Sequence, residues 1–98
     1  MAFYRMYNSA VQFRTVHKHD GMRFIIHANE DCGHNRGHIH IESGDSEIVI
    51  DLQSFKVLKK SGKVNSHKIK MAQKFVKENQ EMFIKYWNEF SNGIKIPA

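Results

Sequence analysis

Three of the chain's seven histidines fall within the stretch GHNRGHIHIE, at His34, His38 and His40. His38 and His40 alternate with isoleucine, which is typical of a strand with one polar and one apolar face. Side chains at positions i and i+2 of a strand point the same way, so we expect these two imidazoles to be neighbours, with Cβ atoms about 7 Å apart. Imidazole nitrogens can bind a transition metal or transfer protons near neutral pH. This stretch is therefore the first candidate site.

A carboxylate is expected beside these imidazoles. The segments HIHIES and SEIVIDL are separated by Gly44-Asp45, which predicts a two-residue hairpin turn. That register places Asp51 opposite His38 and diagonal to His40. A carboxylate next to an imidazole fixes its tautomer and raises its basicity. Arg23 and His27, on the preceding strand, are second-rank candidates for the same face.

Three interpretations of the histidines are open. In the first, His34, His38 and His40 bind a divalent metal such as Zn²⁺, Ni²⁺ or Fe²⁺. In the second, His38 and His40 act as acid and base beside Asp51 without a metal, and Arg23 or Arg36 stabilises a phosphate during RNA cleavage. In the third, the histidines only form hydrogen bonds with their neighbours and serve the fold.

The elements that must position this site are strands followed by helix. Alternating residues predict strands over 10–17, 22–28, 38–43 and 46–52, with a further short strand over 55–60. The hairpin register gathers four isoleucines on one face, at the pairs Ile41–Ile48 and Ile39–Ile50. From Ser66 to Phe90 apolar residues recur near the helical period, with an interruption at Asn79-Gln80. The helical stripe should cover the isoleucines and leave the histidine face open to solvent.

These patterns predict an α+β fold: a mainly antiparallel sheet of four or five strands, covered on one face by a C-terminal helix that is either one long helix or two consecutive ones. The length of 98 residues fits a single domain spanning 1–98. We expect an extra N-terminal strand within residues 1–20 and a loose tail over 94–98.

Charge suggests a second candidate surface. The chain carries 15 Lys and Arg against 10 Asp and Glu, a formal charge of +5, which favours polyanionic partners. Lysines crowd the last strand and the first half of the helical segment, and Lys70, Lys74 and Lys77 share a helix face. They are either a solvated face or contacts to nucleic acid or a protein partner, which would make binding salt-dependent. The contact candidates are Lys59, Lys60, Lys70, Lys74 and Lys77.

The cysteine count and the hydropathy of the chain indicate its cellular compartment. The single Cys32 excludes an internal disulfide and fits a reducing compartment. No apolar run approaches the roughly 20 residues that a membrane span needs. We therefore expect a cytoplasmic protein that does not enter a membrane.

The histidine segment also carries a family resemblance. GMRFIIHANEDCGHNRGHIHIE resembles the corresponding segment of a family of small bacterial domains of unknown function with a His-Pro-Pro-Pro-His-x-His signature. The resemblance extends from about Gly21 to Phe90, and Asn35, Arg36 and Gly37 replace the prolines. Members are encoded beside a small partner protein in gene pairs like toxin–antitoxin modules. The resemblance thus implies a bacterial two-gene setting and no particular activity.

Two functions follow from these observations. The first is a toxin–antitoxin-type component that acts on RNA or a phosphate ester through the histidine face, with or without a metal. The second is a non-catalytic binding or regulatory module that uses the basic helix face, its histidines being structural. Both include a small protein partner, and whether the protein forms a homo-oligomer stays open.

Overall fold

The chain forms a five-stranded antiparallel sheet followed by two helices. The computed structural model describes residues 13–19, 21–27, 36–91 and 95–97. The strands are β1 (Phe13–His19), β2 (Met22–His27), β3 (His38–Ser43), β4 (Ser46–Asp51) and β5 (Val57–Ser61), and the helices are α2 (Ser66–Glu78) and α3 (Gln80–Phe90). Each strand pairs with its neighbour in sequence, so β1 and β5 are the two sheet edges. The predicted α+β class is confirmed, with five strands and two consecutive helices.

The central hairpin has the predicted register. Ser43 pairs with Ser46, and the strands then pair residue by residue up to His38 and Asp51. Gly44 has a φ of 59°, a value that favours glycine and suits a two-residue hairpin turn. Alternation along both strands therefore sets which side chains share a face.

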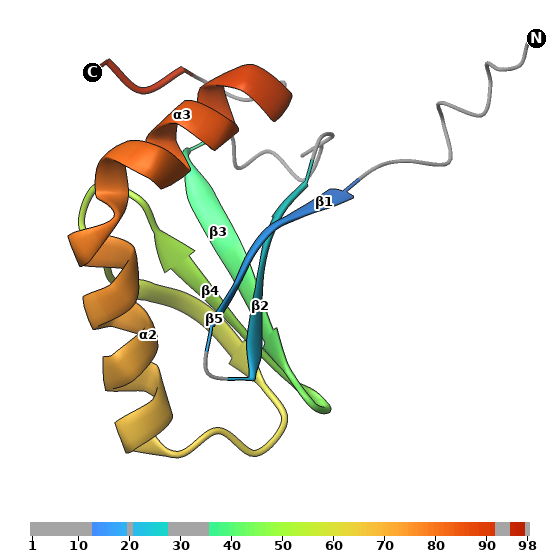
Figure 1. Cartoon of the computed structure of the whole chain (residues 1–98). Helices are drawn as coiled ribbons and strands as arrows, with labels where there is room; N and C mark the ends of the chain where they lie inside the picture. Colours follow the sequence, from blue (N-terminus) through green and yellow to red (C-terminus); the bar gives the residue numbers. More distant parts are fainter. Residues whose placement is uncertain (1–12, 20, 28–35, 92–94, 98) are drawn as a thin grey trace, which may run out of the picture.

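The four isoleucines form the centre of the hydrophobic core. Ile39, Ile41, Ile48 and Ile50 are at most 2% exposed and belong to one cluster with Ala72, Val76, Phe83 and Trp87 of the helices. Both helices lie on the same face of the sheet (Figure 1). The apolar helix stripe and the isoleucine face thus cover each other, as expected from their patterns.

The helical segment is divided at Asn79. Its backbone, with φ −120° and ψ 28°, departs from helical values, and it is both the C-cap of α2 and the N-cap of α3. Asparagine is suited to this position because its side chain can bond the local backbone, and here its Nδ2 donates to the carbonyl of Phe75. The break turns α3 so that Phe83 and Trp87 still reach the core.

The C-terminal segment differs from expectation. Of the expected loose tail over 94–98, the structure describes residues 95–97, and within them Ile96 is only 6% exposed. The side-chain amide of Asn88 donates to the Ile96 carbonyl and accepts from its N–H, both at 2.8 Å. The Ile96 side chain belongs to the hydrophobic core cluster, so its burial and these two hydrogen bonds hold the described part of this segment. At the other end, β1 begins at Phe13, and the rest of the predicted N-terminal strand lies outside the described residues.

No helix among the described residues is long and apolar enough to cross a membrane.

Candidate functional site

His38 is the first residue of β3 and is buried. Only 2% of it is exposed, and its ring centroid lies 5.1 Å from that of Trp87 in α3. Its Nδ1 donates to the carbonyl of Arg36 at 2.6 Å. The expectation that His38 would face solvent is therefore wrong, because α3 passes the end of the sheet where β3 begins (Figure 1).

Asp51 lies opposite His38 in the register, as predicted, but its carboxylate has other partners. Arg36 approaches it with both Nε and Nη2, the second at 3.2 Å. The backbone N–H groups of Gln53 and Ser54 donate to Oδ2 at 3.1 and 2.6 Å. The side chain thus caps the turn after β4 and binds a guanidinium. The register predicted that Asp51 would be the carboxylate partner of His38 or His40. The structure gives it Arg36 and the backbone instead.

The environment of Asp51 fixes its charge. Its side chain is fully buried, and burial, the largest influence, would raise the pKa. Hydrogen bonds from Arg36, Ser54 and Gln53 overcome that effect and lower the pKa from 3.8 to about 2. The same ion pair raises the pKa of Arg36. A carboxylate held this firmly is a poor proton carrier near neutral pH, which favours a structural role.

His40 takes its carboxylate from Glu47. Its Nδ1 donates to Oε2 of Glu47 at 2.9 Å, and Glu47 is diagonal to His40 in the hairpin register. The ring of His27 stacks on that of His40, with centroids 3.9 Å apart, and the ring of His38 lies edge-on at 5.2 Å. The three imidazoles are therefore together, as predicted for this face. The alternation that placed Asp51 beside them could equally have suggested Glu47.

Arg23 does not join this group. It pairs with Glu42 in the register and its Nη2 forms an ion pair with that carboxylate. Glu42 is four residues along β3 from His38, which separates the two positions by about 13 Å at the rise of a strand. Arg23 balances the like charges of Glu42 and Glu47, which are directly opposed in the hairpin.

The metal interpretation rests in part on residues that the structure does not describe. His34 and Cys32 lie outside the described residues. Among 13–19, 21–27, 36–91 and 95–97, no group of three His, Cys, Asp or Glu side chains could hold a metal ion. One atom stands out: Nε2 of His40 is buried and has no hydrogen-bond partner within the described part of the chain.

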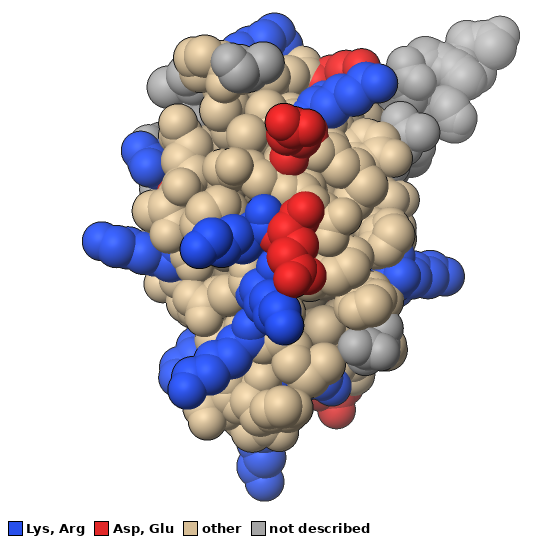
Figure 2. Space-filling view, turned by 60° about the vertical axis from the view of Figure 1, so that its left-hand side comes forward, with Lys and Arg blue, Asp and Glu red and all other residues tan. Residues whose placement is uncertain are grey.

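The lysines lie together around the β5 edge and α2. We define the lysine surface as the exposed lysines between residues 56 and 77: Lys56, Lys59, Lys60, Lys63, Lys70, Lys74 and Lys77. An eighth, Lys68, is half-buried, and its Nζ donates to Oγ of Ser43 at 2.7 Å. In Figure 2, blue side chains dominate the lower half of the view, and most of the red ones lie above them. All five predicted contact lysines belong to this surface.

The segment that carries the lysine surface contains no acidic residue, although Glu78 borders it at the end of α2 and Asp45 lies beside Gly62. No Asp or Glu occurs from Leu52 to Lys77, which holds eight of the fifteen Lys and Arg residues. The other seven stand against all ten Asp and Glu, so the rest of the chain is acidic. The ion pairs within the described part join Arg23, Arg36 and His40 to carboxylates, and none involves these lysines.

A groove lies between β5 and α2. Val57, Leu58, Lys59 and Lys60 of β5 line it with Ile69 of α2, and its volume is about 420 Å³. On α2, positions 70, 74 and 77 form one stripe at the helical period, turned away from the buried Ala72 and Val76. The charge at the groove itself therefore comes from Lys59 and Lys60, and the α2 stripe lies outside its lining.

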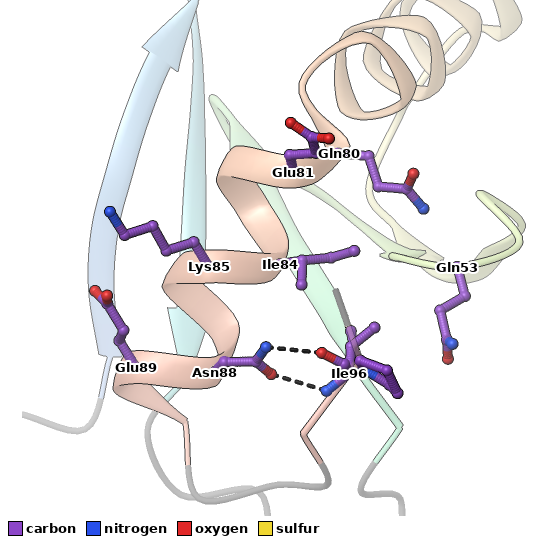
Figure 3. A pocket seen from close by; sticks show the side chains of 9 residues that line it. Gln53, Gln80, Glu81, Ile84, Lys85, Asn88, Glu89 and Ile96 are labelled. Atoms are coloured by element: carbon purple, nitrogen blue, oxygen red, sulfur yellow. Dashed lines mark hydrogen bonds between the residues drawn. The ribbon is translucent and has the colours of Figure 1, made fainter.

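A larger pocket of about 780 Å³ lies elsewhere, beside α3 and the C-terminal segment. Figure 3 shows Asn88 aimed at Ile96 across one side of it, with Gln80 and Gln53 on another. Its charged side chains, Glu81, Lys85 and Glu89, come from one helix and do not converge. None of the described candidate residues from the sequence lines this pocket.

A family model matches most of the chain. The family model described as Domain of unknown function (DUF4160) matches residues 21–88, from the turn before β2 through most of α3. No curated protein and no solved structure matches the chain. The matched region contains every candidate site residue, both histidines and lysines.

Proposed function

We propose that this chain, which belongs to the DUF4160 family of domains of unknown function, is a non-catalytic module that binds a polyanionic partner through its lysine surface. The observation that carries the proposal is the concentration of charge. The whole positive excess of the chain falls between residues 56 and 77, without a single acidic residue there. Polyanions bind to such a surface by displacing their counterions.

The state of the lysines supports this role. Seven of the eight are exposed, and none is neutralised by a carboxylate in the part of the chain that the structure describes. Surface lysines that serve only solubility are ordinarily mixed with acidic residues. A segment with one sign of charge creates a strong local potential, which attracts a charged partner from a distance.

The burial of His38 and the partners of Asp51 support a non-catalytic role for the histidine site. His38 is buried against Trp87, and Asp51 is bound to Arg36 and to the backbone. A large substrate such as RNA needs access to the groups that act on it. In this proposal His38, His40 and Asp51 stabilise the start of the central hairpin, and binding takes place elsewhere. A small protein partner in a toxin–antitoxin-type gene pair would then bind or regulate this module.

Matched charge variants test the proposal. Lys70→Gln with Lys74→Gln removes two charges from the lysine surface, and glutamine preserves helix propensity. Lys18→Gln with Lys85→Gln removes the same charge from exposed positions on β1 and α3. We expect the first pair to weaken binding to heparin, a generic polyanion, by roughly tenfold or more, and the second to have a much smaller effect. Equal losses in both pairs would contradict the proposal.

A divalent metal site is a second candidate, which one observation favours. A neutral His40 that donates Nδ1–H to Glu47 has a lone pair on its buried Nε2, and that atom has no hydrogen-bond partner among the described residues. A carboxylate on the far nitrogen is the usual support of a metal-binding histidine. Zn²⁺, Ni²⁺ or Fe²⁺ would suit it. Elemental analysis of untagged protein tests this candidate: stoichiometric metal, lost in a folded His40→Ala variant, supports it, and metal-free wild-type protein contradicts it.

A further inference from the structure

We infer that the polyanion is the sugar–phosphate backbone of a double-stranded nucleic acid, bound without regard to base sequence. This inference rests on the proposed function and narrows its partner to one class. Three properties of the lysine surface lead to it: the type of its cations, the lack of exposed aromatic rings and the lack of an apolar anchor.

The cations are all lysines. The chain's arginines lie at positions 5, 14, 23 and 36, outside the segment from 52 to 77. Arginine offers a rigid fork that reads guanine through two parallel hydrogen bonds, whereas lysine, which can also contact guanine, acts mainly as a flexible point charge that suits phosphate. A surface of lysines alone is equipped to bind the backbone and not to distinguish bases.

Exposed aromatic rings are missing from the described part of this surface. Phe55 and Phe75, the nearest in sequence, are half-buried, and the ring of Phe75 packs against Phe24 and His19. Proteins that bind single strands stack the bases on aromatic side chains. A duplex keeps its bases stacked on one another and presents mainly phosphates, so it needs no such platform.

An apolar anchor for a protein partner is also weak. Of the large hydrophobic side chains that the structure describes, only Leu58 is exposed, at 41%. Protein interfaces depend on a buried cluster of aromatic or aliphatic residues. The β5 edge is also ill-suited to adding a peptide strand, since it has five residues, carries lysines and is bulged near Leu58.

The arrangement of the lysines fits an extended backbone. At the rise of an α-helix, positions 70, 74 and 77 follow one another along the axis of α2 at steps of about 6 and 4.5 Å. Lys59 and Lys60 are successive residues of the β5 edge and pair with Val49 and Ile48, so their side chains point to opposite sides of the sheet. The row on α2, together with single charges on either side of the β5 edge, can contact phosphates of a rigid, elongated partner at several points.

Fluorescence anisotropy across a salt series tests the inference with the full chain. The probes are labelled RNA and DNA duplexes of about 16 base pairs, the span of a small duplex-binding domain. Each is made in two unrelated sequences. A single-stranded uridine oligomer of equal length is a further probe, and poly-glutamate is a competitor. We expect equal affinity for the two sequences of a duplex, and weaker binding of the single strand. The slope of log binding constant against log salt concentration should become smaller in magnitude by about 1.8 in Lys70→Gln/Lys74→Gln. It should stay near the wild-type value in Lys18→Gln/Lys85→Gln.

The outcomes separate the two proposals. A preference for the RNA duplex or for the DNA duplex identifies which nucleic acid is bound, and either result supports the inference. Single-strand binding as tight as duplex binding, strong dependence on sequence, or displacement by poly-glutamate at equal charge overturns the inference and leaves polyanion binding in place. An absence of salt-dependent binding to every probe and to heparin overturns the proposed function as well. Circular dichroism of each variant confirms that the helices are intact.

Discussion

Arg36 and Asp51 form an ion pair between the residue two positions before β3 and the last residue of β4. The carboxylate is fully buried, whereas the guanidinium side chain is 52% exposed. The pair fixes the end of the central hairpin at which His38 begins β3. It is therefore a structural element at the position where the sequence suggests chemistry.

Asp51→Asn should destabilise the protein by about 1–3 kcal/mol, because a buried charged hydrogen-bond network loses its charge while Arg36 loses its partner. Denaturant unfolding measures the change. Arg36→Gln should cost less in the Asp51→Asn background than in the wild type, since the two residues interact. Additive effects of the two substitutions would show that the ion pair contributes little.

The same carboxylate predicts a pH dependence. Its folded-state pKa of about 2 is below the ordinary value of 3.8, so its contribution to stability is fully present above about pH 4 and is lost as the pH falls toward 2. The shift corresponds to about 2 kcal/mol. The difference in unfolding free energy between wild type and Asp51→Asn should shrink as the pH falls from 4 to 2. A constant difference over that range would contradict the assignment.

Gly37→Ala should destabilise the protein by about 1–3 kcal/mol through overpacking. A Cβ at this position would lie 2.2 Å from Cδ1 of Ile96. The contact is with the end of a side chain, so Ile96→Ala should make room and reduce the cost of Gly37→Ala. A double-mutant cycle followed by thermal unfolding measures this coupling. If the cost is unchanged in the Ile96→Ala background, the crowding lies elsewhere.

Asn88→Ala removes both side-chain hydrogen bonds to the backbone of Ile96. We expect the free energy of unfolding to fall by roughly 1–2 kcal/mol. Hydrogen exchange at the Ile96 amide should also become faster than in wild type, while exchange at amides within β3 changes less. Lys85→Gln, on the same helix, is the control. Unchanged protection of the Ile96 amide would mean that packing alone holds this segment.

His38→Ala distinguishes a structural from a catalytic histidine. Because the ring is buried against Trp87, we expect a loss of roughly 2 kcal/mol or more in stability. Affinity for a polyanion, measured well below the midpoint of unfolding, should stay within about twofold of wild type. A variant that is as stable as wild type but has lost a measurable activity would restore the catalytic interpretation.

Local patterns predicted the hairpin correctly. The alternation of isoleucine with polar residues and the Gly44-Asp45 turn set the register, and the isoleucine face could only be buried against the helical stripe. Asn79 was visible as an interruption in that stripe. These features depend on residues close in sequence, so the sequence alone reveals them.

The surroundings of the candidate site were less accessible. His38 is buried because Trp87 of α3, which is far along the chain, packs against it at the start of β3. No local sequence pattern predicts this contact between α3 and β3. Two carboxylates, Glu47 and Asp51, lie close enough in the register to bond the histidines. His40 bonds Glu47 because Arg36 occupies Asp51, and the sequence does not reveal the position of Arg36. Docking of Ile96 similarly required the space that Gly37 leaves. The lysines themselves were visible in the sequence, and the lack of any acidic residue between 52 and 77 sets their segment apart.

That uneven count has an electrical consequence. A molecule with eight lysines in one acid-free segment and an acidic remainder has a dipole moment as well as a net charge. In the field of a polyanion such a dipole experiences a torque, which turns the β5–α2 side forward before any contact forms. Productive collisions then need less random rotational searching than the small net charge would suggest.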